Sequence, residues 1–150
     1  MWLFAAALLV VVSDQITKFL IDRQFDEGQF IPVIKGLFNI TLVYNPGAAF
    51  GLFPNMKWFF LFFSVAAIIG IVLIARYYMK GRTYCHILLG LVLGGAVGNL
   101  IDRLRIGYVI DFLDVYFRSY HWPAFNIADS AICVGIGLLS LFIIRHQQDF

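Results

Sequence analysis

Hydrophobic residues in this chain gather in long stretches that shorter polar stretches separate. Three of them, residues 58–78, 84–104 and 124–145, come close to the about 20 residues that a helix needs to cross a hydrocarbon core. A fourth, residues 2–21, is interrupted by Ser13, Asp14 and Gln15. It lacks the positive start and the cleavage site of a signal peptide, so we interpret it as a retained span. The pattern predicts four membrane-spanning helices in a single domain, residues 1–150.

The connections between these stretches differ in length. Residues 79–83 form a short one, so the second and third spans should form a hairpin on the side of the two termini. Residues 22–57 and 105–123 form two long connections on the opposite side. Within the first, residues 37–44 alternate as a β-strand does, and Asn45-Pro46-Gly47 predicts a turn. Residues 48–53 are expected to form a short interfacial helix.

Composition supports a membrane protein. Hydrophobic residues make up 61% of the chain and charged ones 13%, against about 25% charged in ordinary globular proteins. The net charge of +2 is too small to indicate nucleic-acid binding, and Lys and Arg form no polybasic tract. The two cysteines, Cys85 and Cys133, are expected to be buried thiols and not a disulfide.

Polar residues in and near the spans collect toward the side of the two long connections. The opposite side has only ordinary flanking residues. A carboxylate near hydrocarbon costs several kcal/mol, so such residues are rarely there without a function. The asymmetry predicts a polar site at one membrane face, built from Asp14, Lys18, Asn45, Asn99, Asp102, Arg103, Asp111, Asn126 and Asp129.

Asp111 and Asp129 are the most informative members of this group, because they bracket the start of the last span. Two carboxylates that meet at one membrane face do not readily ionise together, which is the electrostatic basis of an aspartyl protease. Their spacing of 18 residues leaves other interpretations open. One is a proton or ion pathway through Asp14, Asp111 and Asp129, and another is a purely structural role.

The charged neighbours also allow two interpretations. Asp14 and Lys18 are four residues apart with the acid first, which favours a structural ion pair on one helix face over direct substrate contact. Asp102 and Arg103 can form a pair at the end of a span. Alternatively, Arg103 can bind a peptide carbonyl or a lipid phosphate with its rigid fork of donors.

The third span contains glycines at helical spacing. Gly90, Gly94 and Gly98 follow one another at intervals of four, a pattern that lets helices approach closely in lipid. Close packing is the expected role. Room for an extended substrate beside Gly94, Gly95 and Gly98 is the alternative.

Other chemistries find less support. His86, His121 and His146 are scattered between opposite faces, which argues against a zinc site. Ser130 adjoins Asp129, but neighbours on a helix point in different directions. A Ser–His pair with His121 therefore remains a less favoured alternative. No glycine-rich phosphate loop follows a strand, so nucleotide hydrolysis is not supported.

The candidate residues belong to motifs that occur in a fixed order. The motifs are Asp14-x-x-x-Lys18, Asn45-Pro-Gly-Ala-Ala-Phe-Gly51, Gly94-Gly-Ala-x-Gly-Asn99-x-x-Asp102-Arg103, Val109-Ile-Asp111-Phe112 and Phe125-Asn126-x-Ala-Asp129. The set closely resembles signal peptidase II, the bacterial lipoprotein signal peptidase family, over nearly the whole chain. Each motif is short, but five in register are specific.

The resemblance implies an aspartyl endopeptidase. Its substrate would be a prolipoprotein whose cysteine already carries diacylglycerol, and it would cleave directly before that cysteine. Asp111 and Asp129 match the family's catalytic pair. The residues that would shape the site or hold the substrate are Asn45, Asn99, Arg103 and Asn126. Those that would support the site structurally are Asp14, Lys18 and Asp102.

The resemblance also implies a fold, a location and partners. The expected fold is a membrane α-helical bundle of four transmembrane helices, with a small extracytoplasmic β-cradle (residues 22–53 with part of 105–122) and a short interfacial helix. Both termini would be cytoplasmic and the active site would lie near the extracytoplasmic face of the bacterial inner membrane. This resolves an orientation that the distribution of basic residues leaves open. Expected partners are membrane lipids and family inhibitors such as globomycin, with no nucleic acid, obligate protein partner, metal or other cofactor.

Overall fold

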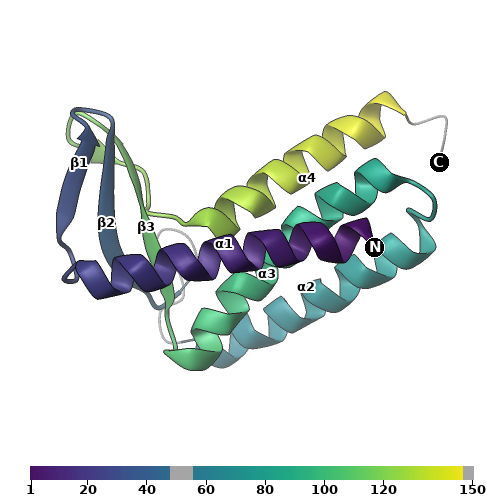
Figure 1. Ribbon diagram of the computed structural model, residues 1–150, viewed down its shortest axis with the longest axis horizontal. Coiled ribbons are helices and arrows are strands. Elements are labelled where there is room, and N and C mark those ends of the chain that lie inside the picture. Colours follow the sequence, from purple (N-terminus) through teal and green to yellow (C-terminus); the bar gives the residue numbers. More distant parts are fainter. Residues whose placement is uncertain (48–55, 147–150) are drawn as a thin grey trace.

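The chain forms four long helices with a small antiparallel sheet at one end (Figure 1). A computed structural model describes residues 1–47 and 56–146. The helices are α1 (Trp2–Gln24), α2 (Lys57–Tyr77), α3 (Thr83–Arg105) and α4 (Ile127–Arg145), and each is long and apolar enough to cross a membrane. The predicted fold class is confirmed. The interfacial helix expected over residues 48–53 lies outside the described residues.

Helix α3 is the centre of the bundle and packs against α1, α2 and α4. Its glycines permit this. A Cβ atom added to Gly94 would lie 2.6 Å from the carbonyl oxygen of Ala7 on α1, and one on Gly98 would lie 2.6 Å from Oδ2 of Asp14. On its other side, Gly95 faces the backbone of Ala128 on α4. The predicted packing role of the glycines is confirmed, and neighbouring helices fill the space that an extended substrate would need.

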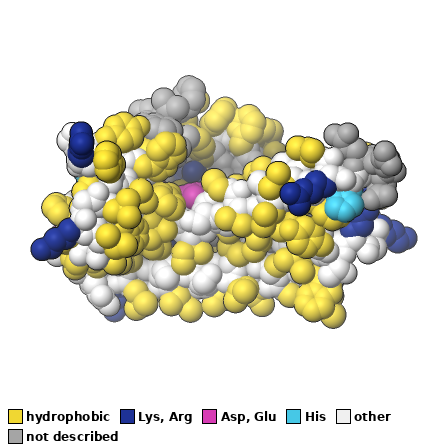
Figure 2. Space-filling view, turned by 90° about the horizontal axis from the view of Figure 1, so that it is seen from above, with side chains coloured by type: hydrophobic (Ala, Val, Ile, Leu, Met, Phe, Trp, Pro, Cys, Tyr) yellow, Lys and Arg dark blue, Asp and Glu magenta, His cyan; other side chains and the backbone are white. Residues whose placement is uncertain are grey.

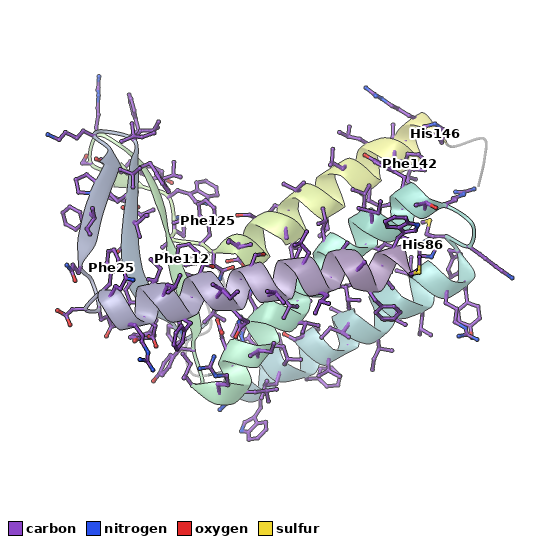
Figure 3. All side chains as sticks on the ribbon, in the orientation of Figure 1. Phe25, His86, Phe112, Phe125, Phe142 and His146 are labelled. Atoms are coloured by element: carbon purple, nitrogen blue, oxygen red, sulfur yellow. The ribbon has the colours of Figure 1, made fainter. Side chains whose placement is uncertain are left out.

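The half of the bundle away from the sheet has an apolar core. Its buried residues come from α1, α2, α3 and the turn after α2, and include Leu3, Ile71 and Leu89. At this end Phe142 stacks on His146, with ring centroids 4.3 Å apart (Figure 3). The ring nitrogens of His86 lie within 3.2 Å of carbonyl oxygens at the connection of α2 to α3.

The sheet joins strands from both long connections in the order β1-β2-β3-β4. The strands are β1 (Phe30–Ile34), β2 (Phe38–Asn45), β3 (Val109–Phe117) and β4 (Tyr120–His121). The strand predicted over residues 37–44 corresponds to β2. Asn45 pairs with Val109 and Val43 with Asp111, so β2 places the Asn45 side chain beside the Asp111 carboxylate.

The sequence between β3 and α4 is where the structure departs most from the expected spans. The last span was predicted from residue 124, but α4 begins at Ile127. The carbonyl oxygen of Phe125 accepts hydrogen bonds from the N–H groups of Phe112 and Leu113, at 3.0 and 2.8 Å. Figure 3 shows Phe112 and Phe125 at this junction. The chain therefore stays attached to the sheet up to Asn126, which caps the helix.

The expectation for the two cysteines was half right. Cys85 is fully buried between helices, whereas Cys133 is exposed. Cys133 lies on α4 and lines a cavity between this helix and the sheet end of the molecule.

Candidate active site

The two candidate catalytic aspartates come from different elements that meet at one point. Asp111 lies on β3 and is 2% exposed, and Asp129 lies in the first turn of α4. The hydrogen bonds of Phe125 to β3 bring the start of α4 directly beside that strand. The sheet and the helix thus place two carboxyl groups that are distant in sequence in one site.

Asn126 contacts both of these carboxyl groups. Its side-chain Oδ1 accepts from the backbone N–H of Asp129 at 2.9 Å, and its own N–H donates to Oδ2 of Asp129 at 3.3 Å. This is a reciprocal capping box, which satisfies helix N–H groups that otherwise lack partners. The Nδ2 group of Asn126 donates to Oδ1 of Asp111 at 2.7 Å. One buried residue therefore holds both carboxyl groups, that of Asp111 through its side chain and that of Asp129 through its backbone N–H.

Two further asparagines occupy the remaining positions around the pair. Nδ2 of Asn45 donates to Oδ2 of Asp111 at 2.9 Å, and Nδ2 of Asn99 donates to Oδ1 of Asp129 at 2.8 Å. The Oδ1 atom of Asn99 in turn accepts from Nζ of Lys18 at 2.9 Å. Because Asn99 accepts through one atom and donates through the other, its amide orientation is fixed.

Behind the asparagines lies a buried ion triad. Nζ of Lys18 lies 2.9 Å from Oδ2 of Asp14 and 2.8 Å from Oδ2 of Asp102, and all three residues are at most 1% exposed. Oδ1 of Asp14 also accepts from the backbone N–H of Ala128 at 2.9 Å. Charges this deeply buried require partners, because removing one costs about 3–5 kcal/mol. The triad joins α1, α3 and α4.

A cavity of about 450 Å³ opens onto the aspartates, with Asn45, Asn99, Arg103, Asp111 and Asp129 in its wall. Figure 2 shows acidic atoms in a hollow between the sheet end and the helices, on a face that is otherwise largely hydrophobic. Arg103 does not pair with Asp102 as one interpretation suggested, since Asp102 binds Lys18. Its guanidinium instead approaches the carbonyl oxygen of Gly47 at 3.4 Å and the ring of Phe60 at 5.2 Å.

Burial of the site changes the protonation of Asp111. Loss of hydration, and secondly the negative charge of Asp129, raise the pKa of Asp111 to about 7. The hydrogen bonds from Asn45 and Asn126 and the charge of Lys18 oppose the rise. A carboxyl group with this pKa still holds its proton close to neutral pH.

The structure brings together the residues that the sequence marked as candidates. Eight of the nine are joined by hydrogen bonds or ion pairs, and Arg103 lines the same cavity. Sequence reasoning missed Gln15, whose Nε2 donates to Oδ1 of Asp102 at 3.0 Å and to the carbonyl of Gly98 at 3.2 Å. The sequence feature that could have identified Gln15 is its position next to Asp14, where it is the third polar residue interrupting an apolar stretch.

The geometry weakens the rival interpretations. Within residues 1–47 and 56–146, the buried charged residues all lie in the half of the bundle near the sheet or in the sheet. A proton pathway would need them in the other half as well. The hydroxyl of Ser130 donates to the carbonyl of Asn126, and Nδ1 of His121 binds Asp114, so no Ser–His pair forms. No cluster of metal-ligating side chains occurs in the described part of the chain.

Comparison with known proteins gives a consistent result. The family model of signal peptidase (SPase) II matches residues 6–145. The chain is 50% identical to the lipoprotein signal peptidase of Geobacter sulfurreducens over 147 residues, covering 96% of this chain and 92% of that protein. It is 46% identical to that of Bacillus subtilis over 136 residues, covering 91% and 88%.

Two solved structures share the fold. Both are bacterial membrane enzymes determined by the in meso method, at 2.3 and 1.9 Å resolution. The first has a TM-score of 0.91 and 31% identity, covering 98% of this chain and 90% of that one. The second has a TM-score of 0.86 and 31% identity, covering 96% and 93%.

Proposed function

The chain belongs to the signal peptidase II family of aspartic endopeptidases, which remove signal peptides from prolipoproteins, and from this premise we propose that Asp111 and Asp129 are its catalytic dyad. The observation that carries the proposal is the link through Asn126. That one residue hydrogen-bonds to both carboxyl groups, and both line the same cavity. Asn99 and Arg103 line this cavity together with the two aspartates.

In the proposed reaction the dyad carries one proton. The ionised carboxylate takes a proton from a water molecule, and the hydroxide so formed attacks the scissile carbonyl carbon. The protonated carboxyl group donates a hydrogen bond to the carbonyl oxygen, where negative charge develops. The tetrahedral intermediate then collapses, the C–N bond breaks, and the amine of the cysteine leaves with a proton from the dyad. We assign the proton to the pair and not to one residue, because coupled carboxyl groups titrate together.

The raised pKa of Asp111 supports this proton balance. With a value of about 7, the pair retains its shared proton up to neutral pH. A carboxyl group at its ordinary pKa would have lost the proton several pH units lower. Burial thus supplies the protonated partner that the reaction requires.

The polar neighbours have distinct proposed roles. Asn45 and Asn126 orient Asp111, and Asn99 orients Asp129, through the hydrogen bonds described above. Arg103 lines the cavity, where its guanidinium lies 3.4 Å from the carbonyl oxygen of Gly47, and would bind carbonyl oxygens of the extended peptide. The triad of Asp14, Lys18 and Asp102 would not touch substrate. It would hold Asn99 and the first turn of α4 in place.

We propose further that the substrate is a diacylglyceryl prolipoprotein, cleaved directly before its lipidated cysteine. The protein would be a single peptidase domain in the bacterial inner membrane, with both termini cytoplasmic and the active site near the extracytoplasmic face. The four apolar helices and the placement of the polar site at the sheet end of the bundle support this arrangement. Family inhibitors such as globomycin would bind the same cavity.

One experiment tests this function directly. The purified protein is incubated with a diacylglyceryl prolipoprotein and with the same prolipoprotein lacking the lipid, and the products are identified by mass spectrometry. We expect a signal peptide cut before the cysteine from the lipidated form alone, at the same rate with and without EDTA. Absence of cleavage contradicts the proposed function. A loss of activity in EDTA that zinc restores contradicts the metal-free mechanism.

A further inference from the structure

A second cavity, of about 570 Å³, adjoins the one that contains the two aspartates. Asn45 and Asp111 line both cavities. From this shared boundary the first cavity continues along α4 to Cys133, whereas the second continues over the sheet to Asp114 and His121. Asp111 therefore lies between a cavity that follows a helix and a cavity that follows a strand.

Asp114 and His121 form a fixed polar pair in the second cavity. Nδ1 of His121 lies 2.9 Å from Oδ1 of Asp114, and the imidazole stacks on Tyr116 with centroids 4.9 Å apart and planes at 9°. Asp114 is itself held, because Nδ2 of Asn39 donates to its Oδ2 at 2.7 Å. Asn39 and Asp114 are buried, while the side chain of His121 is 53% exposed.

This arrangement fixes which ring nitrogen remains available. When the neutral imidazole donates its Nδ1–H to Asp114, Nε2 is left as a hydrogen-bond acceptor on the opposite side of the ring. A buried carboxylate and a stacked tyrosine limit the ring's rotation. Nothing in the proposed reaction uses this pair, so its orientation calls for another explanation.

The spacing along β3 relates the pair to the dyad. Asp111 and Asp114 are three residues apart on one strand, which is about 10 Å at the rise of a β-strand. An extended peptide has nearly the same rise per residue. Asp111, Asp114 and His121 all line the second cavity, so a peptide whose scissile bond lies at Asp111 and which extends through this cavity reaches His121 with about its third residue.

We propose that the second cavity binds the polypeptide that follows the cleavage site, and that His121 is a positioning residue for its main chain. The inference rests on the proposed function, because it requires a peptide cut at Asp111. The first cavity follows the apolar, membrane-length helix α4 and suits the signal peptide, whereas the second lies over the sheet and suits the opposite end of the same chain. Because a hydrogen bond to the main chain does not depend on the side chain at that position, His121 would position substrates of many different sequences in the same way.

Two substrates of different length test the role of His121. One lipidated peptide ends directly after the lipidated cysteine, as an amide, and the other continues for four more residues. We expect His121→Ala to lower kcat/KM by about threefold to tenfold for the long substrate, the usual effect of one hydrogen bond, and to leave the short one unchanged. His146→Ala, at the far end of α4, serves as the control and should change neither.

The outcomes separate the two proposals. An equal loss on both substrates would indicate a general structural effect and overturn the role of His121, as would an unchanged rate on the long substrate. Failure of the wild-type protein to cut either substrate would instead contradict the proposed function.

A cross-linking measurement tests the location independently of rate. The substrate carries a free cysteine three residues after the scissile bond, and the enzyme carries His121→Cys with Cys133→Ser and Asp129→Asn, so that the substrate stays intact. The lipidated cysteine is a thioether and cannot form a disulfide. Under a mild oxidant we expect a disulfide at position 121 and none in the matched His146→Cys variant. No cross-link at position 121, or equal cross-linking in both variants, overturns the proposal.

Discussion

The two halves of the helical bundle are built from the same helices but bury opposite kinds of side chain. Away from the sheet, α1 and α3 bury only apolar residues such as Leu3, Leu89 and Val92. Near the sheet, the same two helices bury Asp14, Lys18, Asn99 and Asp102. The apolar half contributes to stability through packing, whereas every buried polar group of the other half must have a partner. The helices therefore supply a frame, and the site depends on partners which the sheet and α4 bring to it.

Removing Lys18 should have the largest effect on stability. The Lys18→Met substitution leaves Asp14 and Asp102 buried without their shared cation, and we expect a loss of about 3–5 kcal/mol together with loss of cleavage, because Asn99 also loses its partner. Thermal unfolding in detergent measures the loss. Lys80→Met, at an exposed position, is the control. Equal melting temperatures for the two variants would show that the triad is not needed.

An apolar substitution in the other half should separate stability from activity. Leu89→Ala removes a buried side chain that is 4% exposed, and should destabilise the protein by about 2–5 kcal/mol. The folded fraction should keep the kcat/KM of the wild type, since Leu89 lies in the apolar half and lines neither cavity. A large fall in kcat/KM below the melting temperature would mean that the two halves are not independent.

A smaller effect is expected where α1 crosses α3. Gly94→Ala places a methyl group 2.6 Å from the carbonyl oxygen of Ala7, and overpacking of this kind costs about 1–3 kcal/mol. Gly137→Ala is the matched control, because nothing lies within 4 Å of its added Cβ atom. It should be neutral or slightly stabilising. If both variants melt at the same temperature, the close approach of the two helices is not limiting.

The smallest effect expected near neutral pH is the change in kcat/KM as the Asp111–Asp129 pair loses its shared proton. The pKa of Asp111 is raised to about 7, so the shared proton is present below that pH and is lost as the pH rises through it. We expect kcat/KM to fall on the alkaline side, approaching about tenfold per pH unit. Initial rates between pH 5.5 and 9 provide the test. A constant rate up to pH 9 would contradict a dyad that needs its proton.

Much of this architecture could be predicted from the residues themselves. The four apolar stretches define the helices, and the depth of each polar residue indicates that Asp14, Asn99 and Asp129 lie toward one face. The start of α4 was missed because Ala124 and Phe125 look like part of the apolar stretch. Asn126-x-x-Asp129 has the spacing of a capping box, which marks the true start.

Long-range pairing could not be predicted in the same way. Nothing in the local pattern of residues 109–117 shows that they pair with β2, or that Phe125 joins them. These contacts depend on tertiary geometry, and they decide whether Asp111 reaches Asn126. The polar pair of Asp114 and His121 was missed for the same reason, because β4 brings His121 back beside β3.

We have proposed that Asp111 and Asp129 act as one catalytic pair. The most direct test of this proposal is cleavage of a lipidated prolipoprotein by purified Asp111→Asn and Asp129→Asn, with Asp26→Asn, at an exposed position, as the control. We expect each of the first two variants to remain folded and to lose activity by about a hundredfold to ten-thousandfold or more, while the control cleaves at the wild-type rate. Cleavage at the wild-type rate by either Asp111→Asn or Asp129→Asn would contradict the proposal.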